Sequence, residues 1–350
     1  MSDRPLDGML VVDASRMLPG AVLARSLLDL GARLVKLEHP RGGDPMRSAP
    51  PVDEEGTSLG WAAFHRGAES VCCDLRTEDG QRRALELIAA ADVFVESFRA
   101  GTLERWGFAP RRLRAENPRL ISCSLSAYGA VVPDQVGHDL NFVAASGLLS
   151  LLGTPEVPQV QIADVTAGLL AASSILAALL ARERGGKGTH LEQPLATGVL
   201  PFLTWHLADL GRDEPGTLKP GLSGDLPIYR IYTCADGERL ALATFEPKFW
   251  LSILTALRLP QLVRCGLDPG EKGRRATERI QERLASKPRA HWLEIARKKG
   301  LPLSPVDSLQ AAVERGTLTP QAPYFPSLGA PPRGGRAPRL GEHDEAPPRA

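Results

Sequence analysis

Short apolar runs alternate with amphipathic stretches along the first part of the chain. The run Leu10–Asp13 has the length of a strand, the leucines of residues 21–32 recur at helical spacing, and residues 33–40 again have a strand pattern. This order predicts a βαβ unit with parallel strands. The loops at Pro19 and His39 would then lie at one edge of the sheet, where open α/β sheets bind ligands.

The alternation continues, and Thr77 is expected to cap the next helix. A largely parallel sheet, in an α/β fold, is therefore the economical architecture. Residues 40–56, rich in Pro and Gly, are expected to form an irregular surface loop over the sheet edge with mostly solvated charges. The remaining predicted elements are strands at 70–75, 92–98 and 119–129 and helical segments at 77–91 and 102–107.

The second half begins with an apolar helix from about Thr166 to Arg184, followed by a strand and another helix. A Gly- and Pro-rich stretch after residue 210 then indicates a linker between two domains, as the length of 350 residues also suggests. Beyond it we expect a hairpin around Gly237 and a helical region from Pro247 to about Lys299, broken near Pro260 and Pro288. The tail after residue 316 is expected to be extended, wrapping back over the first domain or partly disordered.

Charge and cysteine content narrow the class of partner. The chain has 42 Lys and Arg against 41 Asp and Glu, which gives no electrostatic reason to expect nucleic acid or a membrane surface. The N-terminus lacks a signal-peptide pattern and the apolar runs look too short for a membrane span, so we expect a cytoplasmic protein with a small-molecule ligand. Five cysteines without CxxC spacing support neither a disulfide framework nor a zinc site, and no metal is expected.

No P-loop, GxGxxG, GxSxG or HExxH motif stands where it would be needed, so positioned acid/base side chains are the remaining route to chemistry. His138 stands between a glycine and Asp139 at the start of an apolar helical pattern, and Asp164 falls where a buried helix begins. Both aspartates also suit simple helix capping, with His138 exposed. The hypothesis is that His138 and Asp164 meet across one pocket.

Other polar residues fit a ligand less specifically. Glu246 follows a strand and precedes a proline and two aromatics, which suits either a pocket rim or an ordinary solvated carboxylate. Several arginines fall in loops of the first domain, where they either solvate the surface or pair with a phosphate-bearing ligand. They are Arg41, Arg47, Arg66, Arg99 and Arg105.

Characteristic segments follow one another along nearly the whole chain. They include LDGMLVVDASRMLPG, FHRGAESVCCDL, VESFRAGTLERWG, NPRLISCSLSAYG, GHDLNF, IADVTAG, RGGKGTHLE, FEPKFW, LPLSPVDSL and LGEH. In this order they resemble the family III CoA-transferase and α-methylacyl-CoA racemase family.

The resemblance implies a large Rossmann-like domain built from residues 1–205 and 318–350, a linker at 206–224 and a smaller α+β domain at 225–317. It also implies an interlocked homodimer, with the active site between the large domain of one subunit and the small domain of the other. No separate cofactor is implied, because CoA is part of the substrate.

An acyl-CoA ligand is implied, with its nucleotide on the sheet edge that carries His39, Arg66, Phe98 and Arg105. Two features of this edge depart from the family pattern. Ala68 and Glu69 replace a basic pair, and His39 replaces an arginine, so either Arg41 or Arg47 takes over phosphate contacts or the affinity for CoA is low. The full set of expected contacts is His39, Arg41, Arg66, Gly67, Phe98, Arg99, Arg105, Tyr128, Asp139, Asn141 and Phe142.

Two chemistries occur in this family. Its transferases use the aspartate that matches Asp164 as a nucleophile, whereas its racemases pair that aspartate with the histidine matching His138, supported by a glutamate matching Glu246. Because all three are present, we expect a racemase that acts on 2-methylacyl-CoA by 1,1-proton transfer through an enolate. A CoA-transferase, and a non-catalytic acyl-CoA binder, remain as alternatives.

Overall fold

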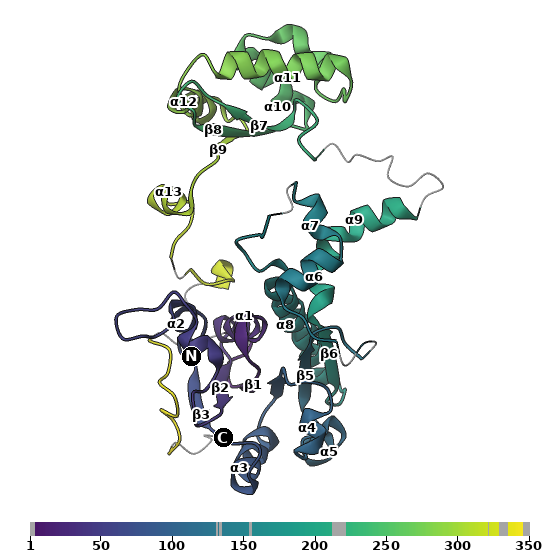
Figure 1. Ribbon diagram of the computed structural model, residues 1–350, viewed down its shortest axis with the longest axis vertical. Helices are drawn as coiled ribbons and strands as arrows, with labels where there is room; N and C mark the ends of the chain where they lie inside the picture. The colour runs from purple at the N-terminus through teal and green to yellow at the C-terminus, as the bar shows by residue number, and fades with distance from the viewer. Residues whose placement is uncertain are drawn as a thin grey trace. The chain divides into compact units, whose positions relative to one another are not determined.

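The chain forms two compact units in a computed structural model (Figure 1): residues 1–204 with 321–350, and residues 205–320. Each unit has its own buried core. Their boundary falls within helix α9 (Leu200–Leu210), so the first residues of the predicted linker are helical. The structure describes residues 4–130, 132, 135–153, 156–211, 222–320, 322–328 and 335–345, and the rest of the predicted linker, residues 212–221, lies outside them.

The large unit is built on a six-stranded sheet in which every neighbouring pair is parallel. Its strand order is β3-β2-β1-β4-β5-β6, the order of doubly wound nucleotide-binding sheets, and it reverses between β1 and β4. The predicted parallel sheet is therefore confirmed. The strands are β1 (Leu10–Ala14), β2 (Arg33–Glu38), β3 (Glu69–Cys72), β4 (Val93–Glu96), β5 (Ile121–Ser126) and β6 (His190–Pro194).

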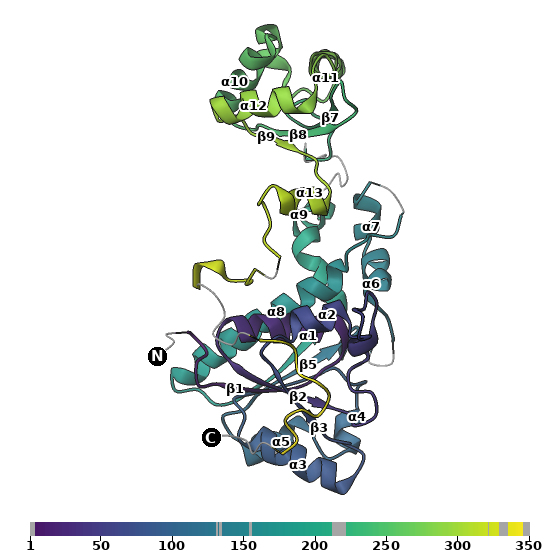
Figure 2. The ribbon, with the colours of Figure 1, turned by 90° about the vertical axis from the view of Figure 1, so that its left-hand side faces the viewer.

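Helices cover both faces of this sheet. Figure 2 shows α1 and α8 on one face and α3 and α5 on the other. Leu27 of α1 and Ile175 of α8 join one apolar core, and Leu87 of α3 and Leu113 of α5 join another. Thr77 caps α3 as predicted, because its hydroxyl accepts a hydrogen bond from the N–H of Gly80. The covering helices are α1 (Met17–Asp29), α3 (Glu78–Ala89), α5 (Pro110–Glu116) and α8 (Ile162–Glu183).

Shorter elements fill the connections of the large unit. The segment 40–56, expected to be an irregular solvated loop, contains a 3₁₀ helix with the buried residues Asp44 and Met46. The charges of this segment are mostly exposed as expected, at Arg41, Asp53, Glu54 and Glu55, and Asp44 is the buried exception. The short elements are η1 (Pro45–Ser48), α2 (Leu59–Phe64), α4 (Thr102–Arg105), α6 (Asp139–Ala145), α7 (Leu148–Leu151), η2 (Leu195–Val199) and η4 (Pro326–Leu328).

Helix α8 packs unusually closely against its neighbours. A Cβ on Gly168 would lie 2.6 Å from the carbonyl oxygen of Pro19 in α1, and one on Gly198 would lie 2.2 Å from the carbonyl oxygen of Ala163. Only glycine at these two positions lets α1 and η2 approach the first two turns of α8. The close contacts fix where that end of the helix lies.

The length and composition of α8 would also allow it to cross a membrane. It has 22 residues, and its most apolar window has a mean hydropathy of 1.8, so the expectation that no apolar run reaches span length is wrong. Core helices of globular domains meet the same criterion, and 39% of this window is buried within the chain.

The small unit combines a three-stranded antiparallel sheet with a helical layer. The predicted hairpin is confirmed, with β7 and β8 paired on either side of the turn at Gly237. The predicted helical breaks are confirmed too, since α10 ends before Pro260 and α12 starts after Pro288. The elements are β7 (Tyr229–Thr233), β8 (Arg239–Ala243), α10 (Pro247–Leu257), η3 (Pro260–Cys265), α11 (Glu271–Leu284), α12 (Arg289–Lys299), β9 (Leu303–Pro305) and α13 (Leu309–Glu314).

The C-terminal segment 335–345 returns to the large unit along its edge strand β3. The N–H of Ser70 donates to His343 Nδ1, the N–H of His343 donates to the Ser70 carbonyl at 3.0 Å, and the N–H of Cys72 donates to Asp344 Oδ1 at 2.7 Å. Backbone groups of an edge strand that would otherwise be open are thereby paired. The expected wrapping of the tail over the first domain is confirmed for these residues.

Replacing Gly168 with alanine is expected to lower the free energy of unfolding by about 1–3 kcal/mol, because the added methyl group meets the backbone of α1. Gly60→Ala is the matched control, since a Cβ at Gly60 in α2 would meet the flexible end of Met46. Denaturant unfolding of both variants measures the difference. Equal stability of the two would show that α1 and α8 are not held at this contact.

Candidate functional site

A cavity of about 280 Å³ opens at the carboxyl edge of the sheet, beside the point where the strand order reverses. Its lining follows three strands: Ser15 and His39 come directly after β1 and β2, and Arg76 lies four positions after the end of β3. Phe98 and Trp106, from the segment after β4, complete its wall. This is the position at which open α/β sheets bind ligands.

The cavity presents a cation and an aromatic pair. Arg76 donates through Nε and Nη2 to both oxygens of Asp74, at 2.8 and 2.7 Å, and its Nη2 also contacts His39 Nε2. These hydrogen bonds hold the pKa of the Asp74 carboxyl well below its usual range. The rings of Phe98 and Trp106 meet edge to face, with centroids 5.3 Å apart. The aromatic wall suits a flat ring, and the Arg76 cation beside it is paired with Asp74.

Ser15 also lines this cavity, as do the charged residues Arg16, Glu38 and Asp44. The Ser15 hydroxyl is buried and has no hydrogen-bond partner among the described residues. Sequence reasoning missed both Ser15 and Arg76. Ser15 directly follows β1 and Arg76 lies four residues after β3, so the sheet-edge argument that selected His39 would also have found them.

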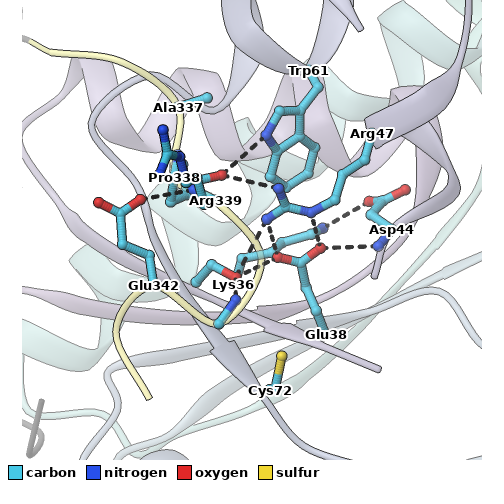
Figure 3. A network of polar contacts seen from close by, with 12 residues as sticks. Lys36, Glu38, Asp44, Arg47, Trp61, Cys72, Ala337, Pro338, Arg339 and Glu342 are labelled. Carbon is cyan, nitrogen blue, oxygen red and sulfur yellow. Dashed lines mark hydrogen bonds and ion pairs between the residues drawn. The ribbon is translucent and has the colours of Figure 1, made fainter. Parts of the chain in front are cut away.

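A buried network of ion pairs lies at this edge of the sheet (Figure 3). Lys36 Nζ donates to Asp13 Oδ2 at 3.0 Å and pairs with Asp44 Oδ2 at 3.3 Å. Burial alone would lower the pKa of Lys36, but the charges of the two aspartates outweigh it, so that the pKa is raised. The amine is therefore held charged inside the fold.

Arg47, one of the expected phosphate contacts, belongs to the same network. It bonds Glu38 through Nε and Nη2 at 2.8 and 2.6 Å, and its Nη1 donates to the Pro338 carbonyl of the C-terminal segment. Its guanidinium stacks over the Trp61 ring at 3.9 Å, and Trp61 Nε1 also donates to Pro338. The cation expected to replace a missing phosphate contact is thus committed to holding the tail.

A second polar cluster forms where α6 begins. Gly137 packs against the rings of Tyr128 and Phe142, and a Cβ there would lie 2.8 Å from Phe142 and 3.2 Å from Tyr128. This packing sets the chain direction into His138, which is exposed and occupies the N-cap position of α6. The N–H of His138 donates to Asn141 Oδ1 at 2.9 Å. Asn141 therefore stabilises the helix start at which His138 stands.

Asp139 joins this cluster to helix α8. The N–H of Asp164 donates to Asp139 Oδ1 at 3.0 Å, so the residue next to His138 touches the backbone of Asp164. The expectation that each aspartate caps the helix it begins is wrong. His138 and Gln161 occupy the two N-cap positions, and Asp164 lies in the first turn of α8 because that helix starts at Ile162, earlier than predicted.

The Asp164 carboxyl has the properties of an acid/base group. Its Oδ1 is buried and has no partner in the described part of the chain. Burial, and to a lesser extent the charge of Asp139, raise the pKa of Asp164 to about 7. At neutral pH both protonation states are populated, as proton transfer in either direction requires.

The other predicted contact residues lie in various places. Arg41, Arg99 and Arg105 are exposed and do not line the cavity, and Arg105 donates to the Thr102 hydroxyl. Arg66 is half-buried away from the cavity. Gly67, at φ +84°, donates its N–H to the Arg336 carbonyl of the tail. Of the expected nucleotide contacts, only His39 and Phe98 line the cavity.

Glu246 belongs to the small unit. It is exposed and occupies the N-cap position of α10. Across the residues that the structure describes, no group of three or more His, Cys, Asp or Glu side chains is arranged to hold a metal ion.

The doubly wound sheet, the cavity at its carboxyl edge and the acid/base carboxyl at a helix start define a ligand-binding α/β enzyme domain with an appended small unit. The chain belongs to CoA-transferase family III, whose model matches residues 6–323.

Relatives in this family carry two kinds of activity. The chain is 30% identical to the alpha-methylacyl-CoA racemase of Homo sapiens, over 97% of this chain and 91% of the relative. It is also 30% identical to the acetyl-CoA:oxalate CoA-transferase of Acetobacter aceti, over 88% of this chain and 82% of that one. The fold agrees with a CAIB/BAIF family protein from Brucella suis, at TM-score 0.79, 27% identity and 98% coverage of both chains. Family membership is compatible with racemase and with transferase activity.

Replacing Asp164 with asparagine is expected to stabilise the protein at pH 8. The folded-state pKa of about 7 lies above the unfolded value near 3.9, so wild-type stability falls as pH rises from about 4 to about 7 and then levels off. The asparagine variant does not lose stability in this way. The difference in free energy of unfolding between the variant and the wild type therefore grows over that range to about 2–4 kcal/mol. Denaturant unfolding at several pH values measures it, and a difference independent of pH would contradict a buried, protonated Asp164.

Proposed function

We propose that this protein is an acyl-CoA racemase acting on 2-methylacyl-CoA thioesters. The observation that carries the proposal is the Asp164 carboxyl, with a pKa near 7 and a buried unpartnered oxygen, joined through Asp139 to the position of His138. A nucleophilic carboxylate attacks in its ionised form, whereas an acid/base residue works best with a pKa near the operating pH, where both forms are populated. The raised value therefore favours proton transfer.

In the proposed reaction, one of His138 and Asp164 removes the α-proton and the other delivers a proton to the opposite face of the planar enolate. The proton lost equals the proton gained, so no oxidant or other reactant is needed. The two residues exchange roles when the opposite epimer reacts. Free N–H groups in the first turn of α8 would stabilise negative charge on the thioester oxygen.

The nucleotide of CoA is proposed to occupy the cavity at the sheet edge. Arg76 and His39 would face its phosphates, and the aromatic pair Phe98 and Trp106 would face its adenine. Arg76 would then supply the positive charge that Ala68 and Glu69 do not, and no cofactor besides the CoA of the substrate is required. We place this reaction in the cytoplasm.

We further propose an interlocked homodimer, in which Glu246 of the partner subunit supports His138. Two features of the chain support an assembly. Leu169 and Leu180 on α8 and Phe202 on α9 are large apolar side chains left exposed, and α13 has no buried residue. Exposed apolar surface of this kind is usually covered by a partner.

A CoA-transferase is the second candidate. Several relatives carry that name, including the succinate–glutarate CoA-transferase of Agrobacterium fabrum, 36% identical over 67% of this chain. The Asp164 carboxylate would then attack the acyl carbonyl. Transfer of CoA from an acyl-CoA to a free carboxylic acid, with His138 replaced and without α-proton exchange, would establish this activity in place of racemisation.

Incubation of the protein with a 2-methylacyl-CoA in D₂O is expected to place deuterium at the α-carbon and to interconvert the epimers. His138→Ala should abolish exchange from one epimer, and Asp164→Asn exchange from the other, because each residue serves one face. Mass spectrometry and chiral separation measure both outcomes.

The chain length of the substrate is varied in the same assay, from short to long and sterol-type acyl groups. Absence of exchange with every branched acyl-CoA would overturn the racemase proposal. Arg82→Ala serves as a control variant, since it removes a side chain that lies exposed on α3.

Arg76→Ala is expected to weaken binding of CoA about tenfold, because a charge-assisted contact to phosphate is lost. Calorimetric titration with CoA measures the dissociation constant, and Arg82→Ala is again the comparison. Unchanged binding by Arg76→Ala would exclude the cavity as the nucleotide site.

A further inference from the structure

The start of helix α8 lacks a cap from its own chain segment. The first N–H groups of a helix have no partner within the helix, and a side chain at the N-cap position usually accepts from them. Gln161 occupies that position and makes no such hydrogen bond. Asp139, which lies 25 residues earlier in the sequence, accepts the N–H of Asp164 in its place.

Because Asp139 accepts this hydrogen bond, the Asp164 carboxyl has no capping role. An aspartate in the first turn of a helix commonly turns back to bond free N–H groups. Here the N–H of Asp164 is already satisfied by another carboxylate, and Asp164 Oδ1 is shielded without a partner in the described structure. The Asp164 carboxyl is therefore not committed to the start of the helix.

We propose that Asp139 is the positioning residue for Asp164: it takes the helix-start hydrogen bond that Asp164 would otherwise make, and it sets its negative charge against the reactive carboxyl. This assignment rests on the proposed function only in giving Asp164 the acid/base role. In this assignment Asp139 acts on the reaction through its neighbour Asp164.

Two fields act on Asp164 in opposite directions. The positive end of the α8 dipole favours a carboxylate and would lower the pKa of Asp164. Burial and the negative charge of Asp139 oppose this and raise the pKa. Because the Asp139 carboxylate itself lies at the start of α8, the helix dipole stabilises the negative charge of Asp139. Asp164 therefore remains able to hold a proton.

No other neighbour of α8 in the described structure acts in this way. The elements packed against α8 are α1, α6, η2, β5 and β6, and η2 has no titratable side chain. Of the groups on these elements, only Asp139 places a charge that acts on the Asp164 carboxyl among the residues described. The titratable groups considered are Arg25, Asp29, Cys123, Asp139, His190 and Glu192, besides His138 at the start of α6.

The variant Asp139→Asn separates charge from hydrogen bonding, because the amide oxygen can still accept the N–H of Asp164. A merely structural cap would work equally well with asparagine. The proposal instead expects the titration of Asp164 to move about one pH unit lower, since a like charge is removed. The alkaline limit of α-proton exchange, where the acid form of Asp164 is lost, should move lower by the same amount.

The titration is measured directly on the full-length protein without substrate, by carboxyl ¹³C NMR of aspartate-labelled samples, with Asp164→Asn identifying the signal. Glu183→Gln is the matched control, since it removes one negative charge at the other end of the same helix. It should leave the Asp164 signal unchanged. Equal titration curves for the wild type, Asp139→Asn and Glu183→Gln would overturn the proposal.

The titration curve of Asp164 in the wild-type protein provides a second test. A midpoint near 4 for Asp164 would overturn the proposal even if the Asp139 variant folded poorly, because no raised carboxyl would then need explaining. The failure of the proposed function looks different. If the midpoint moves as expected but no acyl-CoA exchanges its α-proton, the role of Asp139 stands and the racemase assignment falls.

Discussion

The close approach of three backbone segments at the start of helix α8 is the constraint on which the site depends. Gly168 admits α1, and Gly198 admits η2, so the first turns of α8 cannot shift without a backbone clash. Because that turn is immobilised, a carboxyl on it has a defined direction and a defined degree of burial. The cross-element hydrogen bond from Asp164 to Asp139 completes the arrangement. Rigid packing thereby creates the electrostatic condition that proton transfer requires.

The sheet edge is organised by a different kind of interaction. A buried lysine and a buried glutamate are satisfied by partners from distant parts of the chain, and the C-terminal segment closes over them through Arg47 and Trp61. Removing one partner of such a network leaves an uncompensated buried charge, so its members are held together. The network thereby also fixes the shape of the adjoining cavity. Arg47 illustrates the consequence, since a loop arginine that looks available for phosphate is engaged by the protein itself.

The cavity and the polar cluster at His138 and Asp164 occupy separate parts of the large unit. The cavity lies where the strand order reverses, and the cluster lies at two helix starts beyond β5. In the proposed function a long ligand such as an acyl-CoA joins them, with its nucleotide at one place and its thioester at the other. The small unit, which carries Glu246, would contribute through assembly with a second subunit.

Local patterns determined the parallel sheet, the hairpin, the cap at Thr77 and the identity of His138 and Asp164 as the residues able to carry protons. These follow from periodicity and from short-range chemistry, which neighbouring residues decide. Only the tertiary structure decided that Asp139 serves the helix of Asp164, that Arg47 holds the tail and that Arg76 faces the cavity. Each depends on contacts between groups up to 291 positions apart, and burial and charge at such contacts are set by packing that no local pattern contains.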